Sequence, residues 1–220
     1  MMIRIYFLFS LLMLVHIGFA QTKDSVITQL SYSEANKNES KIQIVTQLQM
    51  DAKSDYDKGY DLNNNNKFTE SILFLIKAIE IDNSGNCGSG INGTAYNELG
   101  YAYTRLNKYD SALYFLNLSI EANSLNPKPY LNQSVVYMQQ KKFDDAIAAL
   151  EKFKLINPEF ATIYAQLGFV YKAAKNKEKA LLNLELFLQK IKETHQEENA
   201  KAMKERVEKS IQELNKSEIK

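Results

Sequence analysis

Three segments of this chain align without gaps from residues 93, 127 and 161, so the sequence repeats itself every 34 residues. Counted from the first residue of each copy, positions 4 and 11 hold a tyrosine in all three. Six of the chain's 13 tyrosines therefore lie at equivalent places, a regularity that is hard to obtain by chance. It constrains the chain to fold as a stack of similar units. The tyrosine pairs are Tyr96 and Tyr103, Tyr130 and Tyr137, and Tyr164 and Tyr171.

Each copy contains two runs of apolar residues at three- and four-residue spacing, which predicts two helices separated by a short polar break. Only 8 glycines and 3 prolines occur in 220 residues, and this scarcity also favours long helices. Small residues recur at positions 8 and 20, where they let two helix backbones approach closely. These are Gly100, Ser134 and Gly168 at position 8 and Ala112, Ala146 and Ala180 at position 20, followed by Leu116, Leu150 and Leu184 at position 24.

A weaker copy begins near Ala52 and has Gly59, Leu75 and Ala78 at the corresponding positions. Its step to the next copy is 41 residues, so about seven residues are inserted near 86–92. The predicted copies therefore lie near 52–85, 93–126, 127–160 and 161–190. Because a single hairpin would leave one apolar face exposed to water, the copies are expected to stack and bury a continuous core.

Residues 96–103 and 164–171 have an aromatic residue, then Leu-Gly, then tyrosine, and this pattern resembles the first helix of the tetratricopeptide repeat family. The resemblance covers roughly residues 52–190. It implies an all-α fold, a right-handed α-solenoid of tandem helix-turn-helix hairpins. The chain departs from the family at position 27, where Ser119, Phe153 and Phe187 replace the usual alanine. Wider packing is expected there.

The segments flanking the repeats have different compositions. Residues 21–40 are polar and are expected to form a flexible lead. The stretch 41–51 has both strand-like alternation and a helical stripe, and helix is preferred because an isolated strand would have no partner, so the repeat domain is taken as 41–190. Residues 191–220 are rich in Lys and Glu with an apolar stripe, which predicts an amphipathic capping helix. A coiled-coil or partner-binding helix is the alternative.

The first twenty residues have the pattern of a secretory signal peptide. Arg4 precedes an apolar run over residues 5–15, and the small residues Gly18 and Ala20 suit cleavage before Gln21. The mature protein is then expected to be exported, to a periplasmic or extracellular location. The alternative is an uncleaved N-terminal anchor, and only that form would place the chain on a membrane.

Composition argues against several kinds of chemistry. Lys and Arg number 27 and Asp and Glu 26, so no strong field of one sign favours nucleic acid. Two histidines and one cysteine are too few for a zinc site built from protein ligands, and no metal or other cofactor is predicted. His195 is expected to be solvated, and Cys87 to be a spectator in a flexible loop. We therefore expect neither an enzyme nor a small-molecule substrate.

What remains is a binding surface. In tetratricopeptide proteins the concave face, formed by positions 2, 5, 9, 12 and 13 of the first helices, binds peptides or helices of other proteins. The resemblance thus implies a protein-interaction module with a concave groove. The alternative is a structural subunit of an envelope or secretion assembly that uses its convex face and terminal helix. The residues predicted to line the groove are Tyr56, Tyr60, Asn97, Tyr101, Arg105, Lys128, Leu131, Val135, Phe169 and Lys172.

The signal-peptide hypothesis predicts that the exported protein begins at Gln21, because signal peptidase requires the small residues that precede it. Intact-mass measurement of the exported chain tests this. A mass that retains the first twenty residues would support the anchored form instead.

Overall fold

A computed structural model describes residues 37, 41–44 and 46–216 of the chain. The chain divides into two compact units, Met1–Leu48 and Gln49–Lys220. In the first unit, residues 41–44 and 46–48 are helical. The predicted signal peptide and nearly all of the predicted lead, 21–40, lie outside the described residues. All that follows concerns the second unit.

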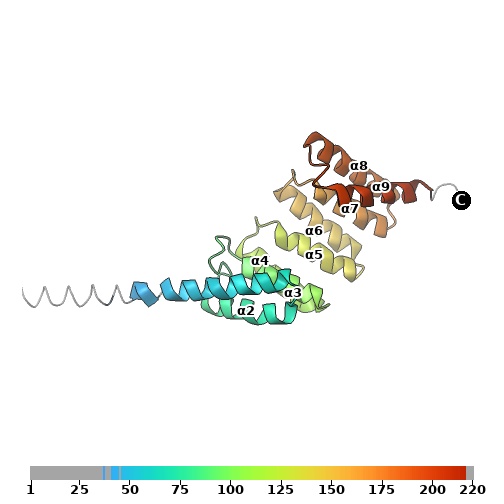
Figure 1. Cartoon of the computed structure of the whole chain (residues 1–220). Coiled ribbons are helices and arrows are strands. Elements are labelled where there is room, and N and C mark those ends of the chain that lie inside the picture. Colours follow the sequence, from blue (N-terminus) through green and yellow to red (C-terminus); the bar gives the residue numbers. More distant parts are fainter. Residues whose placement is uncertain (1–36, 38–40, 45, 217–220) are drawn as a thin grey trace, which may run out of the picture. The chain divides into compact units, whose positions relative to one another are not determined.

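The second unit is a tandem array of helices. Residues 49–64 form a helix that precedes α2. In the described part of this unit, each helix from α2 onward packs against the next one along the chain, and α3 also contacts α5. This order of contacts defines an α-solenoid and confirms the predicted all-α fold. The labelled helices (Figure 1) are α2 Phe68–Ile81, α3 Thr94–Arg105, α4 Tyr109–Ala122, α5 Lys128–Gln139, α6 Phe143–Ile156, α7 Thr162–Ala173, α8 Lys177–Glu193 and α9 Lys201–Lys216.

The same turn joins the two helices of every copy. The residue at position 15 has a left-handed backbone each time, with φ near 60°. The next residue donates its N–H to a carbonyl five residues earlier, as Lys142 does to Tyr137 at 2.8 Å. This geometry is a Schellman motif, which ends a helix and reverses the chain within two residues. The position-15 residues are Asn66, Asn107, Lys141 and Lys175.

Close contact between positions 8 and 24 holds each hairpin together. A Cβ built on Gly100 would lie 2.5 Å from Leu116 Cγ, and one on Gly168 would lie 2.6 Å from Leu184 Cγ. Both leucines are fully buried. In the third copy Ser134 occupies position 8, and its hydroxyl donates to the carbonyl of Leu131 at 2.7 Å. The small residues at position 8 therefore determine how closely the two helices pack, as the sequence predicted.

Position 27 departs from expectation in the second copy. Instead of wider packing, the end of α4 there lies against the loop before α3. Ser119 Oγ donates to the carbonyl of Gly93 at 2.8 Å, and a Cβ on Gly93 would lie 2.7 Å from the Ser119 carbonyl oxygen. Phe153 and Phe187 in the later copies are buried core residues. The prediction was wrong at Ser119 because serine is small enough for this close approach, and its hydroxyl adds a hydrogen bond to a carbonyl that also accepts from Asn97 N.

The inserted loop is built around Asp82, and Cys87 belongs to the core rather than to solvent. One carboxylate oxygen of Asp82 accepts from Ser84 N and Oγ, and the other accepts from Cys87 N at 2.8 Å. Burial alone would raise the pKa of Asp82, but these hydrogen bonds outweigh it and lower the pKa. Cys87 is 0% exposed and packs with Ala52 and Tyr56. Burial and the Asp82 charge raise its pKa to about 12, which keeps the thiol protonated.

Gly100→Leu is expected to destabilise the fold by about 1–3 kcal/mol or more, because the added side chain has no space beside Leu116. Thermal and denaturant unfolding measure the loss. Glu121→Leu, at an exposed position of α4, is the control. Cys87→Ser is not a suitable control variant, because it would place a hydroxyl group in the buried core. Equal stability of Gly100→Leu and Glu121→Leu would contradict the assigned helix register.

Candidate functional site

The first helices of neighbouring copies lie side by side and form one surface, which we call the inner face and define by positions 2, 5, 9, 12 and 13. The contact of α3 with α5 places the second copy beside the third, and Asn132 Nδ2 donates to Asn97 Oδ1 at 2.9 Å across it. Asn63, on the 49–64 helix, donates in the same way to Glu98 on α3. The structure therefore brings the predicted residues of the first three copies together.

Part of this face is exposed. Tyr60 and Val135 are each 42% exposed, and both occupy position 9. Arg105 and Lys128 are exposed, while Tyr101 and Leu131 are half-buried. The combination provides aromatic and aliphatic surface with two cationic groups at its sides. We use the name open groove for the members of the predicted groove in these three copies that are exposed or half-buried: Tyr60, Tyr101, Arg105, Lys128, Leu131 and Val135.

Arg105 is held in place within the open groove. Its guanidinium carbon lies 4.9 Å from the centre of the Phe68 ring and 5.8 Å from that of Tyr101. Nη1 donates to the Tyr101 hydroxyl at 3.0 Å, and the two rings meet edge to face at 6.0 Å. Because these contacts fix an exposed guanidinium before a ligand arrives, less side-chain entropy is lost on binding.

Tyr56 and Asn97, both predicted to line the groove, are buried instead. Tyr56 is 8% exposed and stacks on Tyr60 with ring centres 6.2 Å apart. Asn97 is 3% exposed and is hydrogen-bonded to Asn132. Neither side chain offers much surface to a ligand. Tyr56 instead packs against the ring of the exposed Tyr60, and Asn97 accepts a hydrogen bond from Asn132 on the next copy.

A buried carboxyl group under the groove was missed by the sequence analysis. Glu98 is 8% exposed, and its side chain accepts from Asn63 Nδ2 at 3.1 Å and from Asn97 Nδ2 at 3.4 Å. Burial raises its pKa, and the opposing effects of Asn63, Lys128 and Asn97 are smaller. Periodicity within one copy gave no signal for this group, because Asn63 and Lys128, two of the groups that act on it, lie on neighbouring copies.

The fourth copy's groove residues are covered by α9. The Arg206 guanidinium lies 4.2 Å from the centre of the Phe169 ring. Lys172 Nζ donates to Ser210 Oγ at 3.2 Å and to the Glu213 carboxylate. This hydrogen bond lowers the pKa of Glu213. Phe169 and Lys172 thus contact the chain's own terminal helix, which the sequence placed only generally, as a cap on the last hairpin.

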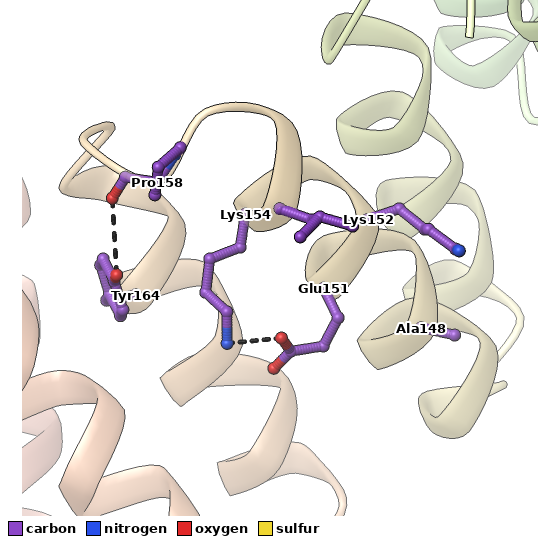
Figure 2. A pocket seen from close by; sticks show the side chains of 7 residues that line it. Ala148, Glu151, Lys152, Lys154, Pro158 and Tyr164 are labelled. Atoms are coloured by element: carbon purple, nitrogen blue, oxygen red, sulfur yellow. Dashed lines mark hydrogen bonds and ion pairs between the residues drawn. The ribbon is translucent and has the colours of Figure 1, made fainter. Parts of the chain in front are cut away.

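A second surface feature is an open hollow of about 700 Å³ between α6 and the start of α7, shown in Figure 2. Lys154 and Glu151 form an ion pair at its edge, and the Tyr164 hydroxyl donates to the Pro158 carbonyl at 3.4 Å. Beside it Leu155 is 77% exposed. The lining residues are Ala148, Glu151, Lys152, Lys154, Leu155, Pro158 and Tyr164.

The described residues hold no group of three histidine, cysteine, aspartate or glutamate side chains arranged to bind a metal ion. None of their helices has both the length and the apolar character that a membrane crossing demands.

Comparison with known proteins identifies the repeats. Residues 93–124 and 127–160 match the family model for the tetratricopeptide repeat, so the chain carries repeats of this kind. Proteins with such repeats are generally non-enzymatic scaffolds. No curated protein sequence matches the chain.

Solved structures show the same fold. MamA is 22% identical, with 66% of this chain and 81% of that one covered and a TM-score of 0.59. TTC0263, a thermophilic TPR protein in Thermus thermophilus, is 16% identical, with 76% and 82% covered and a TM-score of 0.54. The TPR2B domain of yeast Sti1, in complex with pHsp70, is 20% identical, with 55% and 97% covered and a TM-score of 0.50.

The raised pKa of Glu98 predicts how stability changes with pH. The folded state favours the protonated carboxyl, so its stabilising effect is complete below the unfolded pKa and is lost as pH rises through the folded pKa. The stability of Glu98→Gln relative to wild type should therefore increase from about pH 4 to about pH 7. Denaturant unfolding at each pH measures it, with Glu80→Gln on the exposed side of α2 as control. A difference that stays constant with pH would contradict the prediction.

Proposed function

We propose that this protein is an exported, non-enzymatic scaffold that binds a peptide or helix of another protein in its open groove. The observation that carries the proposal is the row of accessible apolar and aromatic side chains at position 9, Tyr60, Tyr101 and Val135, with Arg105 and Lys128 beside it. Such surfaces concentrate binding energy in a few aromatic anchors, while the flanking cations orient an acidic residue or a carboxylate.

The comparisons support binding of this general kind. The yeast Sti1 domain, which shares the fold, is described in complex with pHsp70. The family resemblance implies that members which hold carboxylate tails have lysine and asparagine at the places of Tyr56 and Tyr60, so this chain departs from that pattern. The open groove therefore favours apolar anchors, with Arg105 as the oriented cation.

A second candidate function is that of a structural subunit of an envelope or secretion assembly. Its contact surface would be the side of the second helices that carries position 22, which we call the outer face. It is favoured by apolar residues at position 22 of the second helices, where Leu73 and Tyr114 are each 60% exposed and Leu182 is 55% exposed. The hollow beside Leu155 is lined in part by Ala148, the position-22 residue of the third copy (Figure 2). A row of apolar side chains repeated along a solenoid is typical of an extended contact with another protein.

The groove proposal predicts that Tyr60→Ala combined with Tyr101→Ala weakens binding at least about tenfold, since two aromatic anchors are removed. Peptides selected from a displayed random library against the mature protein are the ligands, and fluorescence polarisation measures their affinity. Tyr114→Ala, which removes an exposed tyrosine from the outer face, is the matched control. Circular dichroism checks folding.

The reverse result would favour the second candidate. If the double variant is folded and binds normally while Tyr114→Ala or Leu155→Asp loses binding or changes the oligomeric state, the outer face is the contact surface and the groove proposal fails.

A further inference from the structure

Helix α9 sits on the inner face of the fourth copy as a bound helix would. Val207 is 0% exposed and packs in one cluster with Ala165, Phe187 and Ile191, and Phe169 packs against this cluster. Arg206 covers the Phe169 ring, and Lys172 pairs with Ser210 and Glu213. The two residues that the inner face would offer a partner at the fourth copy are thus already engaged within the chain.

The attachment of α9 is local. Among the described helices, α9 packs its backbone against α8, and its side chains also contact residues of α7. Figure 1 shows α9 beside α8 at the C-terminal end of the array. Its ion pair with Lys172 lies at the surface, since the Glu213 side chain is 52% exposed and that of Lys172 is 30% exposed. In a solenoid each element depends mainly on its neighbours, so a terminal element opens without unfolding the rest.

The sequence of α9 shows which kind of helix can bind to the inner face of the fourth copy. Its apolar residues Met203, Val207, Ile211 and Leu214 follow the spacing of one helix face. Arginine precedes the second of them and glutamate precedes the last, and these two charged residues contact the Phe169 ring and Lys172. Helix-in-groove recognition uses this pattern of apolar anchors.

We infer that α9 is a displaceable internal ligand: it closes the fourth copy's end of the groove and competes there with a partner helix of the same amphipathic pattern. When α9 leaves, Phe169 joins Tyr60, Tyr101 and Val135 at position 9, and the groove lengthens from three copies to four. The consequence for partners rests on the proposed groove function, whereas the exchange of α9 does not depend on it.

The test uses a fluorescent synthetic peptide of residues 197–216 and the full chain. Val207→Asp should release α9 and let the peptide bind. Wild type should not bind the peptide, because α9 already occupies the inner face of the fourth copy. Gln212→Asp, which adds the same charge on the exposed side of α9, should behave as wild type. Adding Lys172→Glu to the Val207→Asp chain should lower its affinity for the peptide by about two- to fivefold, and a peptide with Glu213→Lys should restore that affinity.

A second form of the experiment covers the case in which Val207→Asp does not fold. A specific protease site is inserted between Glu198 and Asn199, both exposed, and the wild-type chain is cut there. The cut protein should keep its helical circular dichroism signal and exchange its α9 for the labelled peptide. No peptide uptake by the cut protein, or equal uptake by uncut wild type, would overturn the inference.

The partner experiment separates this inference from the groove proposal. Peptides selected on wild type should bind Val207→Asp more tightly if they extend to the fourth copy, and added 197–216 peptide should compete with them. Exchange of α9 together with normal partner binding by the Tyr60→Ala, Tyr101→Ala variant would overturn the groove function and leave the exchange itself supported.

Discussion

The close crossing of two helices within each hairpin is the contact on which the rest of this molecule depends. A glycine at position 8 lies against a buried leucine at position 24, as in Gly100 with Leu116 and Gly168 with Leu184. In these two copies the separation is smaller than a residue with a Cβ allows unless the leucine shifts, whereas the third copy has Ser134 at position 8. Repeating this crossing with the same two-residue turn gives hairpins of nearly one shape, and equal shapes stack.

Stacking then creates what no hairpin has alone, an inner face on which side chains from successive copies meet. Beneath it lies a polar chain that runs from Asn63 through Glu98 and Asn97 to Asn132. A buried carboxyl group is costly unless it is hydrogen-bonded, so the network favours one relative placement of these three copies. Above it lie the residues that we propose as ligand contacts, and among them Arg105 is already oriented by two aromatic rings.

The two ends of the repeat array are not equivalent. At the C-terminal end α9 covers Phe169 with Arg206 and pairs Glu213 with Lys172, so the inner face is used within the chain before any partner arrives. Solenoids need their last apolar face covered for solubility. Here the cover extends onto Phe169, whose position-9 equivalents Tyr60 and Val135 are exposed in the earlier copies. Under the proposed groove function, solubility and ligand access are therefore coupled through one helix.

The sequence by itself determined the repeat length, the helical hairpins, the glycines at the close crossings and the line of inner-face positions, because all of these follow from periodicity within 34 residues. Only the tertiary structure decided which of those positions are open. Cys87, Ser119, Glu98 and Phe169 take their roles from the inserted loop, from neighbouring copies and from α9. The physical reason is that burial and hydrogen bonding depend on contacts between copies and with non-repeat segments, which periodicity within a single copy does not encode.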